Sequence, residues 1–449
     1  MRRLERFLNL FTEVRPGEGA TTLLLAANVF LILGAYYLVK PVREALVLAG
    51  GGAEVKSYAA AGQAVLLMGA VPLYGRLATH LPRRRLLNVV TLFFAACLVG
   101  FYVLARRVPP DRGMALGVAF FLWVGIFNLM VPTQLWAFAN DLYTPEAGKR
   151  LFVLIAFGAS SGAVAGSWAA GRLIEPIGVQ RLMLVAAVVL TASLALTNAV
   201  DARARGGGGD APHRPGGDRA GVPPGNAFAL VARSRYLLLL AAFVLLLNFV
   251  NTTGEYVLGR VALAHAEQIA TTAAAHGLDV EALIGEFYAS FFAVVNLAGL
   301  LLQLFVVSRV LKYGGVRVAV AVLPALSLCG YALVAAAPLL AVVRWVKTAE
   351  NATDYSLMST VRQVLFLPTS RQEKYKAKQV VDTFCVRVGD VLSAALVFAG
   401  TSWLALDVRG FAAVNVALAA VWLGLALLVG REHARRLAAR APAPAPRAA

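Results

Sequence analysis

The sequence predicts an all-α polytopic membrane protein of about twelve transmembrane helices, arranged as two six-helix halves. Three observations support this fold class. The chain of 449 residues is 59% hydrophobic and only 15% charged, whereas roughly 25% of the residues in an average soluble domain are charged. The apolar residues form blocks close to the roughly 20 residues that cross about 30 Å of hydrocarbon as a helix. Basic residues gather between alternate blocks.

Seven apolar windows mark the clearest spans, and more polar windows between them complete the count. The seven windows cover residues 23–38, 86–104, 114–131, 182–196, 237–250, 316–334 and 412–429. The lead-in before the first window is charged and is not followed by a small-residue cleavage pattern. We therefore expect the first span to be retained and not to be cleaved off as a signal peptide.

The net charge of +18 lies largely in the connections between spans. Basic residues precede the first span and follow the second, fourth, sixth, eighth, tenth and last spans. By the positive-inside rule, these connections and both termini are expected to be cytoplasmic. A basic surface for nucleic acid is not needed to explain the charge, so no nucleic-acid partner is predicted.

The chain divides near its middle. Residues 201–235 contain GGGG, PGG and PPG stretches that cannot bury enough apolar surface to fold. We expect a cytoplasmic lead-in over 1–20, a first half over 21–200, a disordered linker and lead-in over 201–235, a second half over 236–430 and a disordered tail over 431–449.

Two features of these halves favour a parallel repeat. Leu23–Ala27 recurs as Leu238–Ala242, and each half carries a charged loop after its second span and a basic loop after its fourth. Both halves begin and end on the same side, which is the architecture of the major facilitator fold. The segment GRLATHLPRRR from Gly75 also resembles a loop motif of that superfamily.

Ionisable residues in the first span have the spacing of one helix face. Lys40, Arg43 and Glu44 are related by i, i+3 and i+4 steps. Each such residue at mid-membrane costs about 2.5–3.5 kcal/mol, so it normally faces a watery cavity or a partner. The alternative is that these side chains snorkel to the interface.

The seventh span carries a polar stripe. Asn248, Asn251, Thr252 and Glu255 follow i, i+3, i+4, i+7 spacing. A shift of 215 residues places Glu255 at the position of Lys40, so related helices carry opposite charges. The pair fits either a structural salt bridge between the halves or a gate.

The tenth and eleventh spans carry more charge than a lipid-facing helix tolerates. Lys347, Asn351, Asp354, Met358 and Arg362 lie near one stripe of the tenth span. In the eleventh, Arg387 and Asp390 are three residues apart and can form an ion pair. A purely structural network is the alternative.

Two further spans have distinct expected roles. Asn128 of the fourth span is a candidate for polar contact with a substrate. The fifth span carries Gly158, Gly162 and Gly166, a small-xxx-small spacing that lets helices approach closely, which we interpret as packing.

Missing motifs exclude several activities. The sequence contains no G-x-x-x-x-G-K-[ST] segment, so ATP hydrolysis of the P-loop kind is not expected. It offers no His-Cys-Asp cluster for a metal or a nucleophile. We predict no metal, no cofactor and no enzymatic reaction, and transport driven by a gradient or by exchange.

Four segments resemble the nucleotide transporters of the ATP:ADP antiporter family, especially their homologues in free-living bacteria. The segments are YYLVKPVREAL (36–46), WAFANDLYTPEAGKRLF (136–152), NTTGEYVLGR (251–260) and residues 355–390 with VRQVLFLP and KYKAKQVVD. This resemblance, from about Arg15 to Gly430, implies a multi-pass protein of the bacterial inner membrane that binds nucleotides such as ATP.

The resemblance also implies roles for individual residues. Cations on the first helix, here Lys40 and Arg43, would engage phosphates beside Glu44, and the acid of the seventh helix is Glu255. Where the family has an acid early in the fourth helix, this chain has Val124 or nearby Asn128. Where the family has a late lysine on the eleventh helix, it has Arg387 and Asp390.

The resulting hypothesis is an alternating-access carrier that exchanges nucleotides, with no oligomer required. The expected substrate-binding residues are Lys40, Arg43, Asn128, Lys347, Asn351 and Arg362, and the expected coupling or gating residues are Glu44, Glu255, Asp354, Arg387 and Asp390. One alternative is a proton-coupled carrier for another, anionic solute. A second is a membrane scaffold or receptor that transports nothing.

Overall fold

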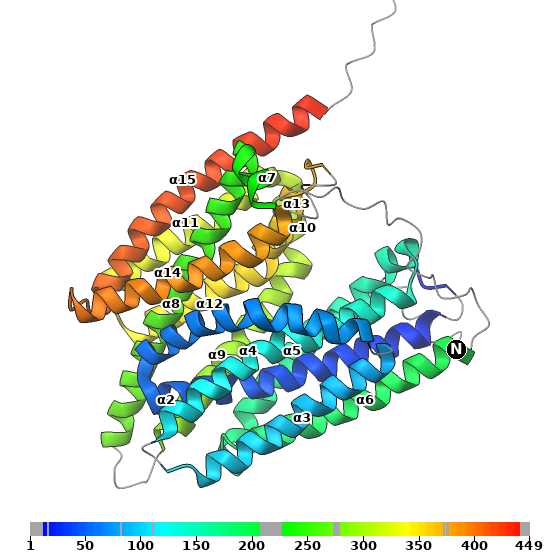
Figure 1. Cartoon of the computed structure of the whole chain (residues 1–449). Coiled ribbons are helices and arrows are strands. Elements are labelled where there is room, and N and C mark those ends of the chain that lie inside the picture. The colour runs from blue at the N-terminus through cyan, green and yellow to red at the C-terminus, as the bar shows by residue number, and fades with distance from the viewer. Residues whose placement is uncertain are drawn as a thin grey trace, which may run out of the picture. The chain divides into compact units, whose positions relative to one another are not determined.

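The structure is a computed structural model that describes residues 12–15, 18–80, 83–109, 112–206, 227–272, 279–370, 373 and 377–440. Within these ranges the chain is helical and contains no strand. The helices are α2 (Glu18–His80), α3 (Arg83–Arg107), α4 (Gly113–Leu142), α5 (Pro145–Ile177), α6 (Leu182–Gly206), α7 (Ala227–Arg233), α8 (Arg235–Thr272), α9 (Val280–Phe305), α10 (Val307–Arg309), α11 (Gly315–Ala336), α12 (Leu340–Thr353), α13 (Ser359–Leu365), α14 (Val386–Ser402) and α15 (Val408–Arg440) (Figure 1).

Nine helices of the described part are long and apolar enough to cross a membrane. The first of them, α2, consists of two arms that meet at a bend at Gly52 (Figure 1). Gly52 has φ +81°, a backbone conformation that side chains with a Cβ rarely adopt. Counting both arms, and adding the interrupted helical segments 340–365 and 380–402, gives the expected twelve spans.

Contacts group the chain into two compact units. Unit 1 contains residues 1–219 and 262–297, and unit 2 contains residues 220–261 and 298–449. This grouping assigns most of α9 to unit 1. The boundaries expected for lead-in, halves, linker and tail stay predictions, and residues 207–226 and 441–449 of the linker and tail lie outside the described residues.

In unit 1, α2 packs on α4, α5 and α6, and α3 packs on α6. The three glycines of α5 face the backbone of α2. A Cβ added at Gly158, Gly162 or Gly166 would lie 2.3–2.4 Å from a main-chain oxygen of α2. The predicted packing role of this glycine stripe is confirmed, because any side chain here would force the two helices apart.

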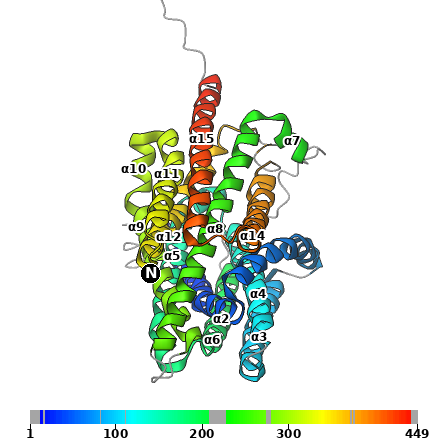
Figure 2. The same cartoon turned by 90° about the vertical axis from the view of Figure 1, so that its left-hand side faces the viewer.

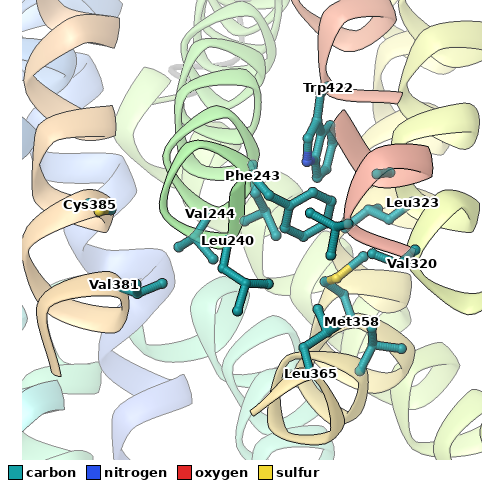
Figure 3. Close-up of a cluster of buried hydrophobic side chains, with 14 of the residues drawn as sticks. Leu240, Phe243, Val244, Val320, Leu323, Met358, Leu365, Val381, Cys385 and Trp422 are labelled. Carbon is teal, nitrogen blue, oxygen red and sulfur yellow. The ribbon is translucent and has the colours of Figure 1, made fainter. Parts of the chain in front are cut away.

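In unit 2, α11 and α15 lie side by side (Figures 1 and 2). The apolar core between its helices contains the fully buried side chains of Phe243 and Trp422, whose ring centroids are 5.7 Å apart. Figure 3 shows Leu323 and Met358 near these rings. Burial of this cluster, with bulky residues from α8, α11, α13 and α15, holds the helices of unit 2 together.

Three segments of unit 2 are π-helical: Val310–Gly314, Asp354–Met358 and Val380–Cys385. The stripe predicted in the tenth span assumes α-helical spacing, and the π-helical segment Asp354–Met358 interrupts that spacing. The π-helical turns from Asp354 change the direction of the side chains that follow. Met358, placed on the polar stripe by its spacing, is fully buried in the apolar core (Figure 3).

Candidate functional site

A buried ionic cluster lies where the two arms of α2 approach each other in unit 1. Glu44, with a side chain only 1% exposed, pairs with Lys56 of the second arm at 2.7 Å. It also accepts hydrogen bonds from Nε and Nη2 of Arg43, the first at 3.0 Å. Both cations are largely covered, so the carboxylate is held by two charge-assisted contacts away from bulk solvent.

Lys40 lies one turn before Glu44 and is covered by aromatic rings. Its Nζ is 3.9 Å from the ring centroid of Phe292 in α9 and 5.1 Å from that of Tyr37. The whole residue is 8% exposed. Ring faces stabilise a desolvated ammonium by cation–π attraction. Lys40 is therefore covered by protein side chains, and its expected role in binding stays a prediction.

Aromatic side chains surround the rest of the unit 1 cluster as well. The guanidinium of Arg43 lies 4.6 Å from the ring centroid of Phe121 in α4. Tyr288 of α9 places its hydroxyl 3.5 Å from Nζ of Lys56.

Asn128, expected in a substrate site, has an exposed side chain on α4. It follows Phe127, whose ring packs 6.2 Å from that of Tyr36.

Unit 2 carries a second ionic cluster, centred on Lys347 of α12. Its side chain is 1% exposed. Nζ donates to Glu350 Oε2 at 2.6 Å and to Asn251 Oδ1 at 2.7 Å, and Glu255 Oε1 lies 3.6 Å away. Asn351 donates to that same Glu255 oxygen at 2.9 Å. The predicted stripe of α8 therefore faces the charged stripe of α12.

Glu350 is the most firmly held carboxylate of this cluster. Ser327 of α11 donates to Oε1 at 2.9 Å, and Tyr331 donates to Oε2 at 2.8 Å. Together with Lys347, these donors satisfy both carboxylate oxygens of a residue that is 2% exposed. A buried charge with this set of partners keeps a fixed position.

The second half of the α8 stripe meets α14. Asp390 Oδ1 accepts from Asn248 at 2.7 Å and from Thr252 at 3.0 Å, while Oδ2 accepts from Arg387 at 3.1 Å. The predicted internal pair of Arg387 and Asp390 is confirmed as a contact. A Cβ at Gly389 would lie 3.0 Å from Leu245 O, so these helices are in close contact.

Asp354 begins the π-helical turns, and Arg362 follows them in α13. Asp354 Oδ1 and Arg362 Nε are buried and without a hydrogen-bond partner among the described residues. The spacing of eight residues that would stack them on an α-helical stripe is interrupted between them. Their expected gating and binding roles stay predictions.

Two arginines tie helix ends together. In unit 1, Arg150 Nη2 lies 3.1 Å from Glu18 Oε1. In unit 2, Arg436 of α15 contacts Glu373 at 3.6 Å and donates to Ser234 Oγ at 2.9 Å. Burial alone would raise the pKa of Glu373, but hydrogen bonds from Ser370 and the charge of Arg436 outweigh it and hold the pKa below the usual 4.5.

Solved structures of several transporters are similar to this chain. A POT family transporter bound to a thioalcohol-conjugated peptide matches with TM-score 0.64 and 13% identity, over 94% of this chain and 97% of that one. The nucleoside transporter NupG matches with TM-score 0.58 and 11% identity, over 93% and 99%. A bacterial homologue of the human lysosomal transporter Spinster gives 0.59 and 12%, over 94% and 99%.

The chain has a major facilitator-like fold. The apolar helices and the structural matches together make it an all-α polytopic membrane protein. Comparison with protein-family models and with curated proteins gives no match. At 11–13% identity the structural likeness concerns the fold, so the resemblance to ATP:ADP antiporters stays a prediction.

Sequence reasoning placed no functional residue at Lys56, Tyr331 or Phe292. The signal for Lys56 is the GGG run at 50–52, which marks the bend that returns the second arm toward Glu44. Tyr331 and Phe292 give no such signal, because aromatic residues in apolar spans are also ordinary core residues. Only tertiary packing brings them to the charged side chains.

Proposed function

We propose that this chain is a secondary transporter that works by alternating access and carries an anionic substrate. The observation that supports this most directly is the buried cluster in which Arg43 and Lys56 contact the carboxylate of Glu44, with Lys40 one turn away beneath aromatic rings. Cations inside a membrane bundle are costly and normally face a pathway or a partner. In a poorly screened site they bind anions strongly.

Nucleotide exchange is the specific activity that we propose. A nucleotide combines phosphate oxygens with a planar base, and the first cluster combines cations with the rings of Tyr36, Tyr37 and Phe292. Base–aromatic stacking contributes about 1–3 kcal/mol per base. The sequence resemblance points to the same substrate class, and NupG among the structural matches is a nucleoside transporter.

In this proposal, Lys347, Asn351 and Arg362 contribute further donors for the substrate. Glu44, Glu255, Asp354, Arg387 and Asp390 take part in coupling or gating. Exchange requires no hydrolysis, since a carrier that reorients only when loaded is returned by the counter-substrate. The membrane is the bacterial inner membrane, with both termini in the cytoplasm.

Counterflow in proteoliposomes tests the proposal. The full-length protein is reconstituted, labelled ATP is added outside, and vesicles with and without internal ADP are compared. We expect internal ADP to stimulate uptake, and Lys40→Ala to reduce it. Absence of stimulation with every nucleotide tested would contradict nucleotide exchange. If Lys40→Ala and Arg362→Ala change only stability and never flux, the chain is a scaffold or receptor instead.

A second candidate is proton-coupled carriage of another anion. The observation in its favour is the partly exposed Glu255 side chain, 24% exposed and 3.6 Å from Lys347. A carboxylate in this position can be neutralised either by a bound proton or by contact with Lys347, so proton binding can compete with that contact. If the carrier is proton-coupled, uptake follows an imposed pH gradient, and Glu255→Gln retains exchange but no longer accumulates the substrate.

A further inference from the structure

Lys347 has two carboxylate partners that differ in distance, exposure and support. Oε2 of Glu350 lies 2.6 Å from Nζ of Lys347, and the Glu350 side chain is 2% exposed. Oε1 of Glu255 lies 3.6 Å from the same Nζ, and the Glu255 side chain is 24% exposed. The first distance is a short charge-assisted hydrogen bond, and the second is outside hydrogen-bond range. One contact is therefore tight and enclosed, and the other is loose and accessible.

Separating Glu350 from this cluster would strand several buried groups. Its oxygens accept from Ser327, Tyr331 and Lys347. A buried donor that loses its partner is destabilising, because it has no water to replace the lost hydrogen bond. Glu255 accepts a hydrogen bond from the amide of Asn351, on the same oxygen that faces Lys347.

Gly254 makes room for this arrangement on α8. A Cβ at this position would lie 1.8 Å from the hydroxyl oxygen of Tyr331 and 3.1 Å from Lys347 Nζ. The tyrosine hydroxyl thus occupies space that any other residue at 254 would fill. The positions of Tyr331 and Lys347 therefore depend on a glycine at 254.

We propose that Glu350 and Tyr331 are positioning residues that hold Lys347 Nζ in place for the anion, whereas Glu255 is the displaceable partner that occupies Lys347 in the empty carrier. The inference rests on the proposed anion transport. An arriving phosphate oxygen takes the place of Glu255 on Lys347, and the contact with Glu350 persists. The two carboxylates then have opposite effects on apparent affinity.

The kinetic test uses labelled ATP uptake into proteoliposomes loaded with ADP. Glu350→Gln is expected to raise KM by about tenfold, with the maximal rate within roughly threefold of wild type. Tyr331→Phe and Gly254→Ala should raise KM by about threefold. Glu255→Gln should lower KM. Glu267→Gln and Tyr313→Phe, both at exposed positions, are the matched controls.

Acylation of Lys347 gives a readout that does not require transport. The purified protein in detergent is treated with acetic anhydride, and labelling of Lys347 is quantified by peptide mass spectrometry. We expect low labelling in wild type and an increase in Glu350→Gln and Tyr331→Phe. Tyr331→Phe and Gly254→Ala keep every charge, so they carry the test if Glu350→Gln does not fold.

The outcomes distinguish a failure of the proposed nucleotide exchange from a failure of the positioning role of Glu350 and Tyr331. If wild type shows no nucleotide exchange, the proposed function is wrong, and labelling of Lys347 still decides whether Glu350 and Tyr331 position it. If wild type exchanges nucleotides but Glu350→Gln and Tyr331→Phe leave KM and labelling unchanged, the positioning role is wrong. A KM shift in the same direction for Glu255→Gln and Glu350→Gln overturns the proposed division of roles.

Discussion

Nζ of Lys56 lies 2.7 Å from Oε2 of Glu44, although the bend of α2 at Gly52 separates the two residues. The bend returns the second arm of the helix so that a cation from one span neutralises a carboxylate from the other.

Glu44→Gln is expected to destabilise unit 1 strongly. The substitution keeps the size of the side chain but leaves Lys56 and Arg43 without their shared carboxylate in a buried position. Breaking one partner out of a buried pair costs about 3–5 kcal/mol. The measurement is the free energy of unfolding in detergent, from a denaturant titration.

The control for this prediction is Glu267→Gln, which changes an exposed acid of α8. A double variant with Glu44→Gln and Lys56→Met should recover part of the loss, because it removes the cation stranded by the first change. Equal stability of Glu44→Gln and wild type would show that the buried pair does not stabilise the fold.

Gly162→Ala is expected to lower stability, whereas Gly100→Ala should not. A Cβ at Gly162 would lie 2.3 Å from the carbonyl oxygen of Phe30, and a Cβ at Gly100 meets nothing within 4 Å. Overpacking costs about 1–3 kcal/mol, while alanine in place of an open helical glycine gains roughly 0.5–1 kcal/mol. Thermal unfolding in one detergent compares the two. Shifts of the same sign in both variants would exclude helix contact as the cause.

The ion pair of Glu373 and Arg436 gives a pH-dependent contribution to stability. The pKa of Glu373 is lowered from 4.5 by Ser370 and Arg436. A depressed pKa means that the contribution is complete above pH 4.5 and is lost as pH falls through the lower, folded value. We therefore expect the difference in thermal stability between wild type and Glu373→Gln to be constant near neutral pH and to shrink below pH 4.5.

Two results would argue against this origin of the effect. The same pH dependence in Glu267→Gln would assign it to the whole protein. A difference that grows as the pH falls would mean that the protonated carboxyl, in place of the ion pair, stabilises the fold. Arg436→Gln should reproduce the pH behaviour of Glu373→Gln, because the two residues share one contact.

Lys40→Gln is expected to raise the KM for nucleotide uptake. The change keeps a polar side chain, shorter by one atom, and removes its charge. Loss of one hydrogen bond to a charged group corresponds to about 1.5–3 kcal/mol, or roughly 10- to 150-fold in KM. Lys312→Gln, in the exposed π-helical segment of unit 2, should leave uptake unchanged. A normal KM in Lys40→Gln would exclude this lysine from the binding site.

Much of the fold follows from the sequence alone, because hydrocarbon imposes a length and a composition on every span. The stripe from Asn248 to Glu255 shows how far periodicity extends to the site: its four side chains do face polar groups of α12 and α14. The placement of Met358 on the polar stripe by α-helical spacing was wrong, because residue types do not reveal π-helical turns. It also gave no indication that Ser327 and Tyr331 of another helix support Glu350.

The π-helical segment Asp354–Met358 has a consequence for the design of variants. A π-helical bulge is related to a regular α-helix by one inserted residue, and each α-helical residue turns the chain by about 100°. Removing a single amino acid from this segment would restore regular winding and leave Arg362 facing nearly the same way relative to Lys347, whereas a deletion in a regular turn would rotate it by about 100°. A deletion within Asp354–Met358 is therefore expected to disturb the charged side chains on either side less than a deletion in the regular turns of α12 or α13.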